Sequence, residues 1–129
     1  MNEQIGYELL TTKPFEAVVA NLEKLTPENQ FRVLHVHDVQ ATLADKGFEC
    51  GPLKIIEVCN AAFAHEALQK NVDVALFMPC KFSVYTKGGR THVCLGRPSM
   101  ISQILPGSGL DQLAADVEER LKKIMHQAV

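Results

Sequence analysis

The sequence feature that most constrains the fold is an apolar stripe near the C-terminus. Across 110–125, apolar residues recur every three or four positions and charged residues stand between them. This spacing gathers the apolar side chains on one side of an α-helix, which must then be buried against another layer. Ser108 followed by Asp111 is a capping-box pattern and predicts where the helix begins. The water-facing side is expected to carry Glu118, Glu119, Lys122 and Lys123.

A tight turn between two apolar segments is the second constraint. The segment Lys87–Arg90 has two central glycines, which supply the positive φ angles that a two-residue hairpin turn requires. We expect a long strand over Val74–Thr86 before the turn and a returning strand over Thr91–Leu95 after it. Pro79 removes a backbone donor from the first strand, so it marks an edge or a bulge.

Alternating and helical spacings place the remaining elements ahead of this hairpin. The expected strands are Ile5–Thr11, Phe31–His37 and Leu53–Cys59. The expected helices are one that Pro14 opens and Thr26–Asn29 interrupts, one over Val39–Asp45 capped by Asp38, and one over Ala61–Lys70 capped by Asn60. The side chains expected to be buried on the last two helices are Val39, Leu43, Phe63, Ala64, Ala67 and Leu68.

This order of elements favours an α+β two-layer sandwich. A chain that ends in a hairpin and one long helix suits a mostly antiparallel five-stranded sheet with helices on one side. A doubly wound parallel sheet is the weaker alternative. No glycine-rich phosphate loop follows any strand, so nucleotide binding lacks its usual signature. We expect residues 1–129 to form a single domain, because the chain has no linker or repeat and suits one hydrophobic core.

Charge and cysteine content narrow the class of protein. Thirteen Lys and Arg against 15 Asp and Glu give a formal net charge of −2, which argues against nucleic-acid binding and against a basic membrane anchor. No secretory signal or membrane span is visible. The four cysteines include no C-x-x-C pair, so we expect reduced thiols and a cytoplasmic protein. They are Cys50, Cys59, Cys80 and Cys94.

Two of these cysteines are candidates for chemistry. Cys59 ends a predicted strand directly before the cap Asn60, so its sulfur is expected near a helix N-terminus, where unpaired amides favour a thiolate. Cys80 follows Pro79 on an apolar strand face. The alternative for both is that a buried cysteine only fills space, and from the residues alone that reading is favoured.

A histidine pair is the only motif typical of metal binding. His35 and His37 lie two apart on a predicted strand, so both imidazoles point to the same face and can converge on one ion. A third ligand is required, and Cys59, Cys80 and Glu57 are the candidates. A solvated strand face explains the same spacing without any metal.

Two dipeptides carry a resemblance to a known family. Cys59-Asn60 stands before an Ala/Leu helix, and Pro79-Cys80 follows about twenty residues on. Together they resemble the bacterial and archaeal domain-of-unknown-function family number three hundred and two. Asp38-Val39 with Thr42-Leu43 is similar to that family's second helix start, while Ala61-Ala62 stands where the family often has proline. The resemblance implies a TATA-binding-protein-like α+β sandwich, often a homodimer, and no established activity.

Three functions follow, and whether the protein is an enzyme stays open. The first, which we favour, is a homodimeric module that binds a small molecule in a cleft near Cys59 and Cys80, without a cofactor, nucleic acid or membrane. The second is a thiol-dependent enzyme or sulfur carrier with Cys59 as the reactive sulfur and Cys80 as its catalytic partner. The third is a metal-binding protein that uses His35 and His37 with a cysteine. The residues expected to contact a ligand are Asn60, Pro79, Asp38 and Glu57.

Overall fold

The computed structural model describes residues 1–129 and contains one five-stranded sheet. Its strand order is β1-β5-β4-β3-β2, and every neighbouring pair is antiparallel. The strands are β1 (Gly6–Thr11), β2 (Arg32–Asp38), β3 (Leu53–Cys59), β4 (Cys80–Lys87) and β5 (Arg90–Gly96). The α-helices are α1 (Phe15–Glu28), α2 (Val39–Ala44), α3 (Ala61–Lys70), α4 (Ile101–Ile104) and α5 (Asp111–Ala128). Two 3-10 helices complete the structure, η1 (Val72–Phe77) and η2 (Pro98–Met100).

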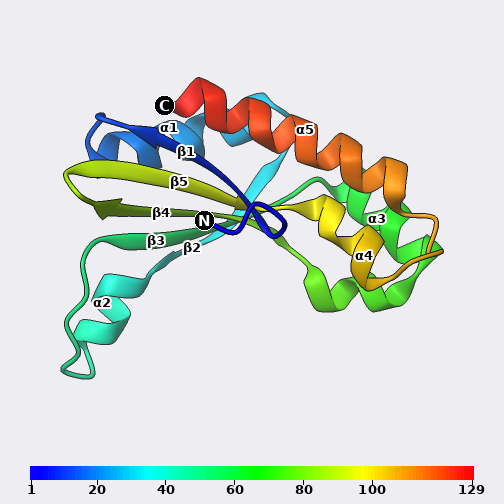
Figure 1. Ribbon diagram of the computed structural model, residues 1–129, viewed down its shortest axis with the longest axis horizontal. Helices are drawn as coiled ribbons and strands as arrows, with labels where there is room; N and C mark the ends of the chain where they lie inside the picture. Colours follow the sequence, from blue (N-terminus) through cyan, green and yellow to red (C-terminus); the bar gives the residue numbers. More distant parts are fainter.

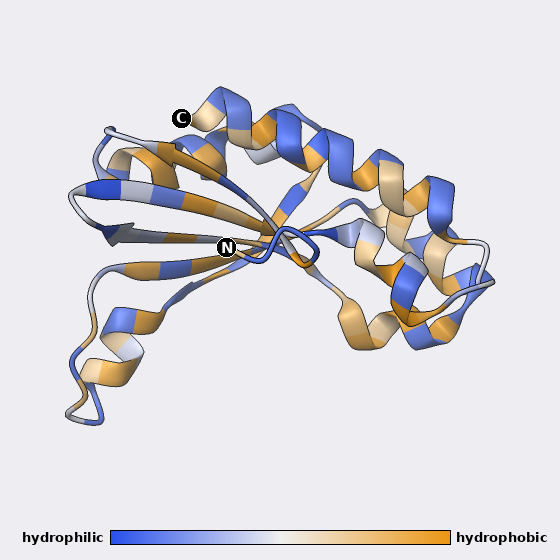
Figure 2. Ribbon diagram, viewed as in Figure 1, coloured by the Kyte–Doolittle hydropathy of each residue, from blue (hydrophilic) through white to orange (hydrophobic).

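The helices cover one face of the sheet and leave the other open. In Figure 1, α1 and α5 lie together over one face, α3 and α4 gather at one end, and α2 projects at the opposite end. Along α5, hydrophobic and hydrophilic positions alternate as bands in Figure 2, as an amphipathic helix docked on a sheet requires. The predicted α+β two-layer sandwich with a five-stranded antiparallel sheet is confirmed.

The predicted hairpin between β4 and β5 forms at the expected residues. Lys87 pairs with Arg90, and Gly88 and Gly89 have φ angles of 60° and 74°. Both angles lie in the left-handed region, where a side chain is disfavoured and glycine is not. The turn therefore fixes the register of the central strand pair.

The strand expected over Val74–Thr86 is wrong in its first part. Residues 72–77 form η1, and β4 begins only at Cys80, directly after a cis Met78–Pro79 peptide bond. Asn71 caps η1, because its side chain accepts a hydrogen bond from the Asp73 amide at 2.9 Å. The apolar run at 74–79 cannot distinguish a strand from a short helix, which is why its spacing misled the prediction.

The first helix continues through the proline that was expected to interrupt it. Pro27 lies in the last turn of α1, where only one intrahelical hydrogen bond is lost. The helix ends at Glu28 with Asn29 as its C-cap, and Gln30 takes a φ of 67°. The Phe31 amide then donates to Thr26 O and the Gln30 amide to Pro27 O, which is a Schellman termination.

The C-terminal helix begins without the predicted capping box. Leu110 occupies the N-cap, no side chain caps the helix, and the Ser108 hydroxyl is buried without a hydrogen-bond partner. The apolar stripe itself is buried as predicted, with Leu121, Ile124 and Met125 fully covered. One residue of the supposed water-facing side is also buried, because Glu118 turns toward the segment that follows β5.

The two predicted asparagine and aspartate caps are present. Asp38 accepts from the Ala41 amide at 3.0 Å, and Asn60 accepts from the Phe63 amide at 3.0 Å. Neither helix buries a full face, however. Val39 and Leu43 on α2 are only half-buried, and Leu68 on α3 is exposed. None of the helices combines the length and the apolar character that crossing a bilayer requires.

Candidate functional site

A cavity of about 490 Å³ lies where the ends of β3, β4 and β5 meet the helical layer. Its walls come from α3, η1, α4 and the first half of α5. Nineteen of its 25 lining residues are hydrophobic, among them Phe63, Leu76 and Val117. A concave site of this volume with apolar walls and few polar groups is typical of small-molecule binding sites.

Small side chains on α3 keep the cavity from being filled. The side of α3 that faces it carries Phe63, Ala64 and Ala67, all half-buried, and α3 has no fully buried residue. Two alanines in succeeding turns leave space where leucines would pack against the sheet. The lining residues are therefore as apolar as those of a hydrophobic core, but they leave a space between them.

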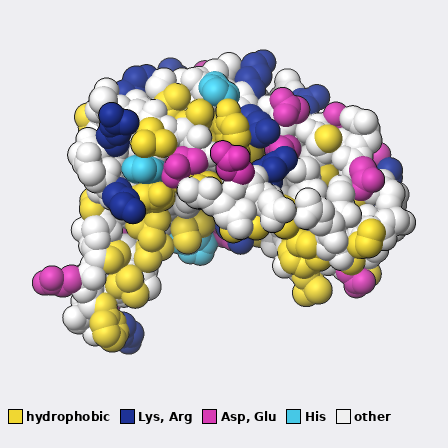
Figure 3. Space-filling view, in the orientation of Figure 1, with side chains coloured by type: hydrophobic (Ala, Val, Ile, Leu, Met, Phe, Trp, Pro, Cys, Tyr) yellow, Lys and Arg dark blue, Asp and Glu magenta, His cyan; other side chains and the backbone are white.

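Exposed apolar side chains surround the mouth of this cavity. Leu76 and Phe77 of η1 are 81% and 51% exposed, and Ile104 of α4 and Ile5 are exposed as well. In Figure 3 hydrophobic side chains gather at the lower edge of the lobe that α3, η1 and α4 form, and the molecule is hollowed between this lobe and the α2 projection. Contiguous exposed apolar groups of this kind mark interaction or ligand sites.

Four residues singled out from the sequence meet at the cavity. Cys59, Asn60, Pro79 and Cys80 all line it. The cause is the β3–β4 ladder, whose last pair is Val58 with Cys80, so the end of one strand adjoins the start of the other. The cleft near Cys59 and Cys80 is thus a physical cavity, and the two dipeptides form adjacent parts of its wall.

The register does not set the two sulfurs opposite each other. Cys80 pairs with Val58, whereas Cys59 pairs with Arg32 of β2. Because side chains alternate along a strand, Cys80 points with Val58 to the helix-covered face and Cys59 begins on the open face. Both are free thiols. The two side chains therefore start on opposite faces of the sheet, although both residues border the cavity.

The surroundings of Cys59 do not support the acidic thiol expected there. Burial raises the pKa of Cys59 above its ordinary value. Burial, followed by the nearby Cys59, raises the pKa of Cys80 to about 11. The amide expected to stabilise a thiolate, that of Phe63, instead donates to the Asn60 side chain. Since the thiolate is the nucleophile, both shifts oppose reactivity at neutral pH.

Asp38 and Glu57, the other two expected ligand contacts, lie outside the cavity wall. Asp38 caps α2 and also accepts a hydrogen bond from Thr42 through its carbonyl oxygen. Glu57 lies on the open face of the sheet, where its carboxylate is 2.9 Å from His37 Nε2. Their side chains are thus engaged with the protein itself.

The histidine pair also lies on the open face. The rings of His35 and His37 are 4.3 Å apart, nearly perpendicular, and a bulge shifts the strand register between Val33 and His35. Glu57 contacts His37, but no group of three or more His, Cys, Asp or Glu side chains is arranged to hold a metal ion. The metal site stays a prediction for which this arrangement supplies no third ligand.

A second polar cluster on the open face was not foreseen. Tyr85 Oη, His92 Nδ1 and Cys94 Sγ all lie within hydrogen-bonding distance of Glu8 Oε2, at 3.2, 3.1 and 3.5 Å. The hydrogen bond with His92 is the main cause that lowers the pKa of Glu8, while burial raises the pKa of Tyr85 to about 12. These residues are up to 86 positions apart, so no local motif could reveal them.

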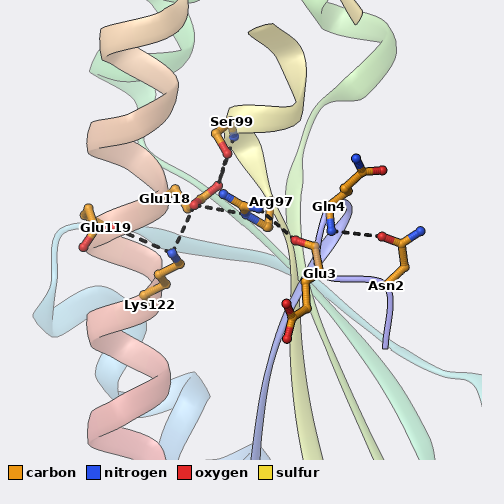
Figure 4. A network of polar contacts seen from close by, with 8 residues as sticks. All are labelled: Asn2, Glu3, Gln4, Arg97, Ser99, Glu118, Glu119 and Lys122. Carbon is orange, nitrogen blue, oxygen red and sulfur yellow. Dashed lines mark hydrogen bonds and ion pairs between the residues drawn. The ribbon is translucent and has the colours of Figure 1, made fainter. Parts of the chain in front are cut away.

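A buried ion-pair network joins the cavity wall to α5. Glu118 accepts from the Ser99 amide and hydroxyl at 3.1 and 2.6 Å, from Arg97 Nε at 3.2 Å and contacts Lys122 Nζ at 3.1 Å (Figure 4). Burial alone would raise the pKa of Glu118, but the Ser99 hydrogen bonds, with Lys122 and Arg97, hold it below its ordinary value. Arg97 also donates to the Glu3 carbonyl at 2.8 Å. The network fixes the start of η2 against α5.

Fold and site together define a class: a two-layer α+β protein with an open antiparallel sheet and an apolar cavity at one end. The sequence model of the family described as "Domain of unknown function DUF302" matches residues 7–128. The chain belongs to the DUF302 family. This confirms the family resemblance carried by the Cys59-Asn60 and Pro79-Cys80 dipeptides.

A solved structure agrees with this assignment. The chain is similar to an uncharacterized conserved DUF302 protein from Bacillus stearothermophilus, with a TM-score of 0.91 and 29% sequence identity. The alignment covers 97% of this chain and 98% of that one. No curated protein matches the chain.

Proposed function

We propose that the protein binds a small, mainly apolar molecule in the cavity beside Cys59 and Cys80. The observation that carries this proposal is the cavity of about 490 Å³ with 19 hydrophobic residues among its 25 lining residues. An apolar ligand would cover surface that otherwise contacts water, and this transfer is favourable by roughly 25 cal/mol for each Å² removed.

The polarity of the wall supports binding rather than catalysis. Only Asn60, Lys81 and Arg97 contribute polar side chains other than thiols, and no histidine or carboxylate lines the cavity. General acid–base catalysis needs such a group within hydrogen-bonding distance of the reacting atoms. The raised pKa values of Cys59 and Cys80 likewise oppose thiol chemistry. The enzyme alternative is therefore the weaker one.

The binding proposal is tested with the neutral fluorescent probe N-phenyl-1-naphthylamine. We expect saturable fluorescence enhancement with the native chain and a loss of at least tenfold in affinity for Ala67→Phe, because Ala67 lines the cavity. Ala62→Phe is the matched control, since Ala62 is exposed on the same helix and does not line the cavity. Equal probe binding by the native chain and Ala67→Phe, with both folded by circular dichroism, would overturn the proposal.

We also propose the homodimer that the family resemblance implies and the cytoplasmic location that the cysteine content suggests. The exposed apolar residues Leu76 and Phe77 are compatible with burial by a second chain. Sedimentation equilibrium of the purified protein tests the dimer: a mass near 14.3 kDa at all concentrations would exclude it.

A further inference from the structure

We infer that the ligand of this cavity carries a single negative charge on an apolar body, as a medium-chain carboxylic acid does, and that Lys81 binds its carboxylate. This inference rests on the proposed function and adds the chemical class of the ligand. It follows from the three polar side chains of the wall and from which of them already have partners.

The charged residues of the wall have one sign. Lys81 and Arg97 line the cavity, and no aspartate or glutamate does. A cavity with low-dielectric walls and charge of one sign concentrates the field at its mouth and favours a ligand of the opposite sign. A cationic amphiphile would meet repulsion there, and a neutral one would gain nothing from either charge.

Asn60 is not free to recognise a ligand. Its Oδ1 accepts from the Phe63 amide at 3.0 Å, and its Nδ2 donates to the Gln30 carbonyl at 2.9 Å. Turning the amide toward a ligand would uncap α3 and leave the Gln30 carbonyl without this donor. The role of Asn60 is therefore to hold the cavity wall in place.

Arg97 is also engaged. Its Nε donates to Glu118 and its Nη1 to the Glu3 carbonyl, so the guanidinium is held in the network of Figure 4. Its charge is balanced by the Glu118 carboxylate. Arg97 therefore adds little net charge to the cavity, and Lys81 is the wall cation without a carboxylate partner.

Lys81 is the polar side chain of the wall that has no protein partner. It makes no side-chain hydrogen bond and no ion pair. Glu57 stands across the ladder from it, but the Glu57 carboxylate contacts His37 instead. The ammonium is therefore available to a ligand.

The surroundings of Lys81 leave room for a carboxylate. By alternation its side chain starts on the open face of the sheet, next to the Phe82–Leu95 pair of the β4–β5 ladder, and Gly96, which follows Leu95, also lines the cavity. Gly96 has no side chain, and a Cβ added there would meet nothing within 4 Å. A head group bound beside the first residues of β4 would let the apolar tail pass the strand end into the cavity that α3 and α5 border.

The test compares octanoate, 1-octanol and octylammonium as competitors that displace N-phenyl-1-naphthylamine. We expect octanoate to displace the probe at about tenfold lower concentration than 1-octanol, and octylammonium to be the weakest. Lengthening the acid by one methylene is expected to strengthen binding about fourfold while the tail still fits. Octanoate binding is expected to weaken as salt is added.

Variants assign the effect to Lys81. Lys81→Gln is expected to remove most of the advantage of octanoate over 1-octanol, while 1-octanol binding stays within twofold of the native value. Lys87→Gln is the matched control, because Lys87 lies on the same strand and face but does not line the cavity. An equal effect of both variants would show a diffuse charge effect and overturn the assignment to Lys81.

The two proposals fail in different ways. If 1-octanol and octanoate displace the probe equally from the native chain, the inference about charge is overturned and apolar binding stands. If the probe itself does not bind in the cavity, the proposed function is overturned, and the inference with it.

Discussion

The two ends of α5 lie over regions that are packed in opposite ways. In its second half, the apolar side chains of Leu121, Ile124 and Met125 are fully buried over the sheet beside α1. Its first half, with Leu113 and Val117, borders the cavity. The apolar stripe is equally regular in both halves. The same apolar face of α5 therefore packs in the core in its second half and lines the cavity in its first half.

The difference comes from the opposing element. Against the second half, α1 supplies Val18, Val19 and Leu22, whose branched side chains fill the space between helix and sheet. Against the first half, α3 supplies Phe63 with the alanines 64 and 67. The size of the side chains that oppose α5 therefore decides whether a cavity remains, and the sequence of α5 alone does not predict it.

The largest expected effect on stability comes from a substitution in the packed region. Leu121→Ala is expected to lower the free energy of unfolding by about 2–5 kcal/mol, because the fully buried side chain leaves a void among close-packed neighbours. Leu113→Ala, at the cavity, is expected to lower the free energy of unfolding by less, since solvent or a ligand already reaches that wall. Urea denaturation of both variants measures this, and equal losses would contradict the distinction between the two halves.

The next effect concerns the network that joins the two regions. Glu118→Gln is expected to lower the free energy of unfolding by about 1–3 kcal/mol, because it weakens hydrogen bonds to a charged group that is only 4% exposed. Glu119→Gln is the control, since Glu119 is mostly exposed and its change is expected within about 0.5 kcal/mol. If Glu118→Gln lowered the free energy of unfolding by no more than Glu119→Gln does, the network would contribute little to stability.

The same carboxylates predict how stability depends on pH. The pKa of Glu118 and that of Glu8 are both lower in the folded chain than the ordinary 4.5. Their contribution is therefore present above pH 4.5 and is lost as the pH falls through the lowered values. Thermal unfolding between pH 6 and 3 is expected to show a falling melting temperature, with a shallower fall for Glu118→Gln. A melting temperature unchanged down to pH 3 would contradict this.

A smaller effect is expected at the cap that holds α3 beside the cavity. Asn60→Ala is expected to cost about 1 kcal/mol, because the Phe63 amide loses its acceptor. Asn60→Asp keeps that acceptor and is expected to recover most of the loss. Chemical denaturation measures both variants, and equal losses would mean that the hydrogen bond to the Gln30 carbonyl, which both variants remove, matters more than the cap.

The smallest effect is expected from adding bulk at the cavity, and it is compared with adding bulk in the packed core. Ala67→Leu adds bulk to an unfilled space and is expected to change the free energy of unfolding by no more than about 0.5 kcal/mol. Val18→Leu adds less bulk to a filled space and is expected to cost about 1–3 kcal/mol. The reverse order of costs would show that the cavity closes in solution.

Local signals predicted most of the secondary structure. The Gly88–Gly89 turn, the caps Asp38 and Asn60 and the α5 stripe are set by residues at most a few turns apart, and the structure has them as expected. The errors fall where local and tertiary preferences differ. Residues 72–77 form η1 instead of a strand, and Ser108 is buried without capping α5.

The sequence by itself determined the order of most elements, the antiparallel hairpin and the caps Asp38 and Asn60, because each depends on backbone preferences, local capping or side-chain periodicity. Only the tertiary structure decided the one-residue offset between Cys59 and Cys80, the burial of Glu118 and the free ammonium of Lys81. These depend on register and on contacts between distant segments, such as Arg97 with Glu3. Hydrophobic pattern selects which faces are buried, but the bulk of the opposing side chains decides whether a core or a cavity results.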